Sequence, residues 1–212
     1  MDRMVLSIGG LSMPSQTFLQ LKSPKKEKIE KILLDVFCKQ PVSLVKVSEI
    51  VEAMAMSRGA FYKYFTDLED AYHYIVKKYS GVVHGDILQA ISQNEHDFFQ
   101  GIKHYLAWCG QLDQTSEEWK ILKLLTQSNE LSGGKRVKLS ADSPMLTQWT
   151  TLLKNNQFQM STTEEALSFL YFVMALVMDS IKDLIVNDWS ADELVQDFHY
   201  KASWLSNGLH TK

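Results

Sequence analysis

The placement of the prolines constrains this chain more than any other feature of its sequence. No proline occurs between Pro41 and Pro144, and none follows Pro144. Because proline interrupts helices more strongly than any other residue, its absence permits long helices across most of the 212 residues. Apolar side chains recur at helical spacing, and no run shows the bounded alternation that is typical of strands. The sequence therefore predicts an all-α fold.

Start signals and apolar stripes locate the individual helices. Ser23 and Pro24 offer a cap residue followed by proline at the first helical position, and Pro41 ends the stripe that follows. That stripe consists of Ile29, Ile32, Leu33, Val36 and Phe37. Another helix is expected to begin at Asp67, with Asp70 as a capping partner. Later helices are expected near residues 82–92, 95–112, 116–130, 145–156, 163–187 and 191–207, with a loop at 132–144.

The charge of the chain is unevenly distributed. Residues 1–65 carry ten basic and six acidic side chains, whereas residues 66–212 carry twelve basic and nineteen acidic ones. The net charge of −3 is therefore a sum of +4 in the first part and −7 in the second. We expect only the first part to meet a polyanion. The two cysteines exclude a disulfide framework.

Neither a membrane span nor a signal peptide is expected. The most apolar stretch, residues 166–178, is shorter than the roughly 18–20 residues that a membrane-spanning helix needs. The N-terminus contains no apolar core of signal-peptide length. We therefore expect a soluble, cytoplasmic protein. Met13 is an alternative start, which would leave residues 1–12 as a leader outside the fold.

Residues 47–65 have the size of a helix-turn-helix. The first short helix carries the stripe Val47, Ile50, Val51 and Met54. The second begins at Ser57, whose hydroxyl can cap the free amides of the first turn. If Phe61 and Phe65 point inward, the outer face of this second helix contains Gly59, Ala60, Tyr62 and Lys63, flanked by Arg58 and Tyr64.

This outer face has the chemistry of a helix that recognises DNA. Its small residues allow close approach to a groove, its tyrosines can contact sugars and bases, and its Arg and Lys supply positive charge. Free amides beside Ser57 can bind a phosphate. These properties suit a recognition helix in the major groove. An ordinary amphipathic helix with exposed tyrosines is the alternative, because helix-turn-helix spacing by itself is common.

The segment "SRGAFYKYFTDLEDAYHYI" resembles the signature of TetR-family transcriptional regulators, and "MPSQTFLQL...KEKIEKILLDVF" is similar to one branch of that family. The resemblance covers residues 13–80. It implies a homodimer that binds a palindromic DNA operator through one helix-turn-helix head per subunit. It also implies a larger helical domain that binds a small-molecule effector. On this basis the chain divides into a leader and N-terminal arm (1–22), a DNA-binding domain (23–66), a connecting helix (67–80) and an effector-binding and dimerisation domain (81–212).

The resemblance assigns DNA contacts residue by residue. Arg58, Ala60 and Tyr62 would face bases, and Lys63 and Tyr64 the DNA backbone. The full set of expected contact residues is Lys46, Ser48, Ser57, Arg58, Gly59, Ala60, Tyr62, Lys63 and Tyr64.

Three positions depart from the family pattern. Lys46 stands where Ser or Thr usually caps the first helix of the motif, Ala55 where the turn usually has Gly, and Leu68 where Lys usually begins the next helix. If the turn needs a left-handed residue, Ala costs about 1 kcal/mol relative to Gly. The loss of a lysine removes one phosphate contact per subunit, which weakens binding and makes its salt dependence shallower.

The C-terminal part offers a dimer interface. Residues 166–186 are apolar nearly all round, so such a helix must be covered on every side. The last helix adds a second stripe formed by Leu194, Phe198, Ala202, Trp204 and Leu205. We expect a homodimer through the helices near 163–187 and 191–207, which would form a four-helix bundle. A monomer whose other helices cover these faces is the alternative.

Candidate effector-binding residues are Tyr105, Trp108, Trp119, Phe172 and Asp179. Aromatic side chains suit an apolar pocket, and Asp179 with Asp183 would suit a cationic ligand. The alternatives are a packed aromatic core and a solvated or interface pair of carboxylates. The identity of the effector does not follow from the sequence.

The sequence contains no catalytic motif of known mechanism, and its His and Cys residues do not have the spacing of metal ligands. We therefore expect no enzyme activity, no cofactor and no metal. The leading hypothesis is a ligand-responsive repressor that binds double-stranded DNA and is released by an effector. The alternative is a helical dimeric interaction protein with weakened DNA binding, and a helical enzyme is a third, weaker hypothesis.

Overall fold

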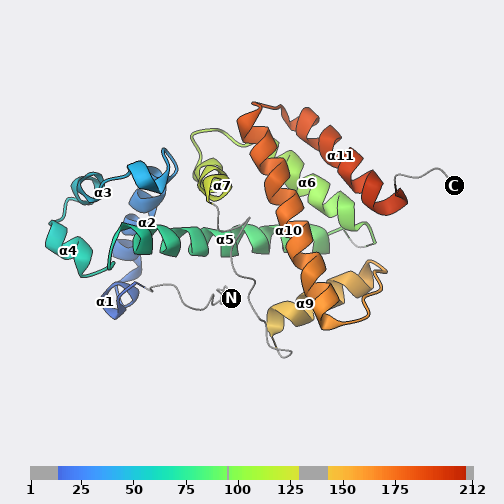
Figure 1. Cartoon of the computed structure of the whole chain (residues 1–212), viewed down its shortest axis with the longest axis horizontal. Coiled ribbons are helices and arrows are strands. Elements are labelled where there is room, and N and C mark those ends of the chain that lie inside the picture. The colour runs from blue at the N-terminus through green and yellow to red at the C-terminus, as the bar shows by residue number, and fades with distance from the viewer. Residues whose placement is uncertain (1–13, 95, 129–142, 209–212) are drawn as a thin grey trace. The chain divides into compact units, whose positions relative to one another are not determined.

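The computed structural model describes residues 14–94, 96–128 and 143–208, and these residues form helices and no strand (Figure 1). The all-α prediction is therefore confirmed. In chain order the elements are α1 (Gln16–Leu19), α2 (Ser23–Phe37), the 3-10 helix η1 (Val42–Leu44), α3 (Val47–Ala53), α4 (Arg58–Tyr62), α5 (Leu68–Ser92), α6 (Phe98–Gly110), α7 (Glu117–Gln127), α9 (Pro144–Asn155), α10 (Thr163–Val186) and α11 (Ala191–Asn207).

One prediction about the helices is wrong, and one helix is additional. The sequence predicts separate helices before and after residue 81, but α5 is a single helix of 25 residues. Gly81 does not end it, because glycine inside a helix costs only about 1 kcal/mol. Asp67 caps its start, as expected, by accepting a hydrogen bond from the Asp70 amide at 2.8 Å. The additional helix is α1, which falls in the segment assigned to the leader and arm. Residues 1–12 and most of the expected loop 132–144 lie outside the described residues.

The chain divides into two compact units. The first contains the described residues up to Val82 together with those from Gln114 onward to Ser128, and therefore holds α1 to α4, the first part of α5, and α7. The second contains Val83–Asp113 and the described residues after the second gap, and therefore holds the rest of α5 with α6, α9, α10 and α11.

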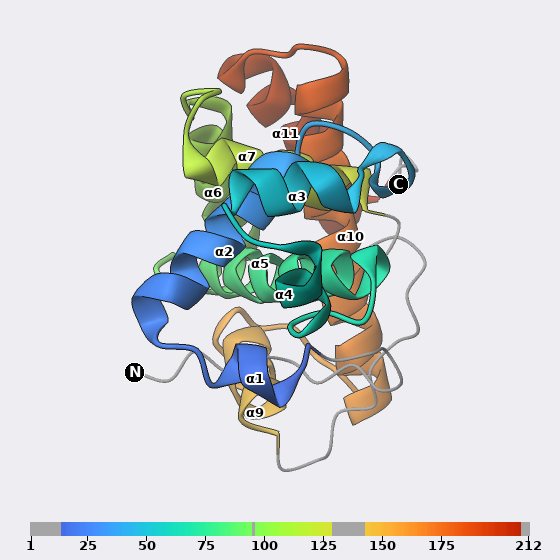
Figure 2. The ribbon, with the colours of Figure 1, turned by 90° about the vertical axis from the view of Figure 1, so that its left-hand side faces the viewer.

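Aromatic side chains form the centre of the first unit. Phe18, Phe61 and Phe65 are almost completely buried, and so is Ile50 of α3. The ring centroids of Phe18 and Phe65 lie 4.8 Å apart, and those of Phe61 and Phe65 lie 5.6 Å apart. Figure 2 looks onto this unit with α3 and α4 toward the viewer. Ile50 and Phe61 therefore anchor the two short helices in this core.

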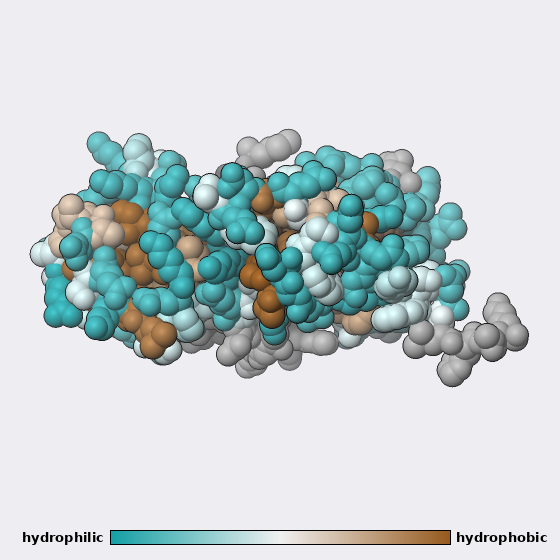
Figure 3. Space-filling model, turned by 90° about the horizontal axis from the view of Figure 1, so that it is seen from above, coloured by the Kyte–Doolittle hydropathy of each residue, from teal (hydrophilic) through white to brown (hydrophobic). Residues whose placement is uncertain are grey.

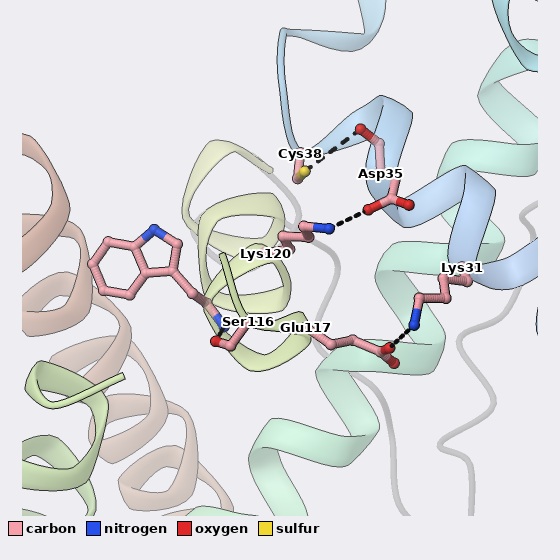
Figure 4. Close-up of polar contacts among 7 residues, drawn as sticks. Lys31, Asp35, Cys38, Ser116, Glu117 and Lys120 are labelled. Atoms are coloured by element: carbon pink, nitrogen blue, oxygen red, sulfur yellow. Dashed lines mark hydrogen bonds and ion pairs between the residues drawn. The ribbon is translucent and has the colours of Figure 1, made fainter. Parts of the chain in front are cut away.

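Two ion pairs join α7 to α2 in the first unit (Figure 4). Lys31 Nζ lies 3.3 Å from Glu117 Oε2, and Lys120 Nζ lies 2.6 Å from Asp35 Oδ1. Cys38 is buried beside this contact, and its burial raises the pKa of its thiol. Helix α7 therefore packs on the N-terminal unit although it lies within the C-terminal half of the sequence, an arrangement that periodicity alone does not predict.

Close helix packing holds the second unit together. Helices α6, α10 and α11 contact one another, and α9 contacts α10. A Cβ atom at Gly101 would lie 2.5 Å from Cα of Ile91, so only glycine fits where α6 crosses α5. Trp149 is fully buried, and its indole N–H donates to the carbonyl oxygen of Ala166 at 2.7 Å. This bond ties α9 to the first turn of α10.

Hydrophilic side chains cover most of the face seen in Figure 3, and hydrophobic residues reach it in separate patches. Within the described ranges, no helix is long and apolar enough to cross a membrane. The apolar residues 166–178 instead supply much of the buried side of α10, including Leu170, Val173 and Val177.

Candidate nucleic-acid interface

The turn between α3 and α4 has a helix-ending geometry that normally requires glycine. The amide of Ala55 donates to the carbonyl of Glu52 at 3.0 Å, and the amide of Met56 donates to that of Val51 at 2.9 Å. This pair of bonds is the Schellman motif, whose residue after the C-cap is left-handed and usually glycine. Here that residue is Ala55, with φ at +51°. The sequence-based concern about this position is justified, and alanine costs about 1 kcal/mol there.

Helix α4 presents the outer face that its sequence predicts. Ser57 caps it, and the Ser57 hydroxyl accepts a hydrogen bond from the Ala60 amide at 3.2 Å. Phe61 is completely buried, whereas Tyr62 is 53% exposed. Arg58, Gly59 and Lys63 are exposed as well, and Ala60 is half-buried. Small, basic and aromatic side chains therefore share one exposed surface.

Helix α3 contributes two further exposed side chains. Lys46 occupies the N-cap position of α3 and makes no side-chain cap hydrogen bond. Ser48 is exposed in the first turn of the same helix. The free amides of this turn therefore have no side-chain acceptor from the N-cap residue. A phosphate oxygen could take that place, because helix N-termini favour anions.

Tyr64 differs from its predicted orientation. Its side chain is only 8% exposed, and its ring packs 5.7 Å from that of Phe18, with Lys25 Nζ 5.7 Å from the ring centroid on another side. The prediction of a flanking outer position is therefore wrong. Its cause is that α4 ends at Tyr62, so the helical spacing of 100° per residue no longer applies two residues later.

The cationic side chains of this surface are Lys46, Arg58 and Lys63, all of which are exposed. Within the described ranges, Lys46, Arg58 and Lys63 form no ion pair, although several other lysines of the same unit do. Leu68, the first residue of α5, brings no charge to the surface. Three cationic side chains therefore stay available around α3 and α4 for an anionic partner.

The expected effector residues belong to three helices, α6, α7 and α10. Tyr105 is 5% exposed and its ring lies 5.6 Å from that of Trp108, which is 43% exposed on the same helix. Phe172 is 44% exposed on α10, and Trp119 belongs to the first unit. Asp179 lies 3.9 Å from Lys201. That lysine also pairs with Asp183 and Asp197.

Two further features of the second unit were not expected. A pocket of about 780 Å³ lies between the end of α9 and the start of α10, lined by Thr150, Leu153, Lys154, Phe158, Met160 and Ala166 among others. None of the five expected effector residues lines it. His84 on α5 is the second feature: its Nε2 is buried without a hydrogen-bond partner among the described residues, and burial lowers its pKa to about 4.

Comparison with known proteins identifies the family. Residues 97–209, more than half of the chain, match the family model described as the tetracyclin repressor-like C-terminal domain. The chain therefore belongs to the tetracyclin repressor-like, or TetR, family. Its all-helical fold is that of a ligand-responsive transcriptional regulator, with a helix-turn-helix head and a helical ligand-binding domain.

Solved structures agree with this assignment at the level of the fold. A TetR-like transcriptional regulator from Rhodococcus sp. RHA1 is 12% identical with a TM-score of 0.58, covering 89% of this chain and 99% of that one. The fatty acid degradation regulator FadR from Bacillus halodurans is 19% identical with a TM-score of 0.53, covering 91% and 100%. A TetR-family regulator from Pectobacterium atrosepticum is 16% identical with a TM-score of 0.52, covering 91% and 99%. No curated protein matches the sequence.

Proposed function

We propose that this chain is a repressor that binds a palindromic DNA operator as a homodimer and is released by a small-molecule effector in the cytoplasm. The observation that carries the proposal is the exposed outer face of α4, where Arg58, Gly59, Tyr62 and Lys63 lie together above a buried aromatic core. Arg58 and Lys63 have no acidic partner among the described residues. This face suits the major groove of DNA.

The contacts divide by chemistry into two groups. We assign Arg58, Ala60 and Tyr62 to base edges, as the resemblance to the family implies; Arg58 and Tyr62 are exposed and Ala60 is half-buried. We assign Ser57, Lys63 and the start of α3, with Lys46 and Ser48, to phosphates, where amides, hydroxyls and cations fix the position on the duplex. Gly59 keeps the backbone close to the groove. Tyr64, buried behind this face, supports it from the core.

Exposed apolar side chains on α10 and α11 support the homodimer. Phe172 and Val186 of α10 are 44% and 70% exposed, and Tyr200, Trp204 and Leu205 of α11 are 50%, 51% and 45% exposed. So many large apolar residues at the surface of one helix pair favour burial by a second copy. Heads that bind successive turns of the major groove would then lie about 34–36 Å apart.

An effector would act by binding one arrangement of the dimer more tightly than the other. We propose a site in the second unit near Tyr105 and Trp108, where a buried tyrosine ring lies 5.6 Å from a tryptophan ring that is 43% exposed. Phe172, Asp179 and Trp119 stay candidates. Helix α5 contributes residues to both units and is one of the covalent connections between them.

Selection of bound duplexes from a random DNA pool tests the proposal. We expect the wild type to enrich one palindromic sequence, and Tyr62→Ala and Lys63→Ala to lose that enrichment while remaining dimers by light scattering. Lys154→Ala, which removes an exposed lysine of the second unit, is the matched control and should select the same sequence. Failure of an intact wild-type dimer to enrich any sequence would refute the repressor function.

Three observations favour a second candidate, a dimeric interaction protein with weakened DNA binding. Lys46 provides no side-chain cap, Ala55 strains the turn, and Leu68 offers no cation. Such a protein would bind its protein partner equally well with or without Tyr62 and Lys63. We propose no enzyme function, because the proteins of similar fold are transcriptional regulators.

A further inference from the structure

Ser15, which precedes α1, contacts the end of α4 through both its backbone and its side chain. Its amide donates to the carbonyl oxygen of Tyr64 at 2.9 Å, and its hydroxyl donates to the carbonyl oxygen of Lys63 at 2.6 Å. The two partners of the hydroxyl bond are 48 residues apart in the sequence. We call Ser15 together with α1 the N-terminal clasp.

The two bonds reach the carbonyl of Lys63, the C-cap residue of α4, and the carbonyl of the next residue, Tyr64. The last carbonyl groups of any helix lack intrahelical donors, and a helix as short as α4, with five residues, has little stability of its own. The Ser15 hydroxyl also accepts a hydrogen bond from the Phe18 amide at 3.2 Å, which caps α1. A single side chain therefore connects the start of α1 with the end of α4.

Phe18 completes the clasp from the core side. It is fully buried, and its ring lies 5.7 Å from that of Tyr64, 4.8 Å from that of Phe65 and 5.1 Å from that of Tyr74 on α5. One ring thus contacts the residues that follow α4 and the helix that comes next. Tyr62 and Lys63, which we assign to DNA, immediately precede this contact.

We propose that Ser15 and Phe18 are positioning residues for DNA recognition, which hold the C-terminal end of α4 and with it Tyr62 and Lys63. The inference rests on the proposed function, because the orientation of α4 matters only if Tyr62 and Lys63 contact DNA. The clasp orders this end of α4 before DNA arrives, so that binding does not have to supply the ordering free energy. Neither residue needs to touch DNA.

Hydrogen exchange tests whether the clasp orders α4, independently of DNA. In Ser15→Ala we expect amides of residues 58–65 to exchange about fivefold faster, because the hydrogen bond from the Ser15 hydroxyl to the Lys63 carbonyl oxygen is lost. Ser15→Thr keeps the hydroxyl and should restore the wild-type rates. Ser43→Ala is the matched control, since it removes another serine of the same unit that is exposed and has no hydrogen bond with the described residues. Unchanged exchange over residues 58–65 in Ser15→Ala would overturn the inference.

A double-mutant cycle then tests positioning on the operator that the wild type selects. Ser15→Ala should lower the affinity about fivefold or more, and Ser15→Thr should restore it. Lys63→Ala keeps the backbone carbonyl that Ser15 contacts, so the clasp remains, and its weakened binding to that operator is measured at low salt, where DNA affinity is highest. If Ser15 acts through the end of α4, its replacement should have a clearly smaller effect in the Lys63→Ala background. Equal losses in both backgrounds would mean that Ser15 acts independently of Lys63, and would overturn its role in positioning that residue. A wild type that selects no DNA would refute the proposed function, whereas the exchange experiment would still decide whether the clasp orders α4.

Discussion

Helices α4 and α10 reach their folded state in different ways. Helix α10 has 24 residues, a Thr162 cap and apolar side chains on most of its sides, so its own sequence and its packing both favour it. Helix α4 has five residues, follows a strained turn at Ala55 and is held by contacts from elsewhere in the first unit, including those of Ser15. Of these two helices, the one that we assign to DNA recognition therefore has less support from its local sequence. A recognition surface built in this way depends on its surroundings for its orientation.

The largest effect on stability is expected from a substitution in α9 at its contact with α10. Trp149→Ala removes a fully buried ring and the hydrogen bond to Ala166, and should lower the free energy of unfolding by about 3–5 kcal/mol. Trp149→Phe keeps most of the ring and should lose less. Denaturant unfolding measures both values. If hydrogen exchange in the Trp149→Ala protein rose as much in α4 as in α10, the two regions would share one source of stability and the comparison would fail.

A second effect concerns pH and the part of α5 that belongs to the second unit. Burial lowers the pKa of His84 to about 4, below the value of about 6.5 for an unfolded histidine, so the unfolded chain binds the proton more tightly. Stability should therefore fall as the pH falls from about 6.5 to 4, by about 3 kcal/mol from this group, and this contribution should change no further below that range.

Urea unfolding at several pH values measures this slope. His84→Gln should flatten it, whereas His104→Gln, which removes an exposed histidine of α6, should leave it unchanged. Equal slopes in wild type and His84→Gln would contradict the prediction.

The smallest expected effect on stability concerns Ala55 in the turn before α4. Ala55→Gly relieves a left-handed backbone and should stabilise the chain by about 1 kcal/mol. Ala53→Gly makes the same chemical change at the end of α3 and should destabilise it by up to about 1 kcal/mol. Thermal unfolding measures both. Two changes of the same sign would show that the strain at Ala55 does not limit stability.

Helical spacing in the sequence correctly predicted the inner and outer faces of α4, but it gave the wrong orientation for a side chain beyond the end of the helix. Phe61 is buried and Tyr62 exposed, as the helical spacing predicts. Tyr64 is buried, which contradicts the prediction that it lies beside the outer face. The reason is that α4 ends at Tyr62, so helical spacing no longer applies at Tyr64. The capping role of Ser57 was also predictable from the local sequence, because its hydroxyl accepts a hydrogen bond from the amide of Ala60, only three residues away.

Contacts between distant segments were beyond such reasoning. Nothing in the sequence near Ser15 indicates that its hydroxyl reaches Lys63, and nothing in α7 indicates that Lys120 pairs with Asp35 of α2. The expected effector residues illustrate the same limit. Periodicity predicts which face of a helix is apolar, but it does not predict which other helix that face meets, and Tyr105 and Trp119 lie in different units.

The sequence by itself determined the class of the fold, most helix positions, the caps of α4 and α5 and the outer face of α4. Each of these depends on interactions between residues a few positions apart, and their free energies are encoded in local spacing. Only the tertiary structure decided that α7 packs on the first unit and that Ser15 and Phe18 contact the end of α4 and the residues after it. These depend on packing and hydrogen bonds between segments far apart in the chain, and no local pattern records them.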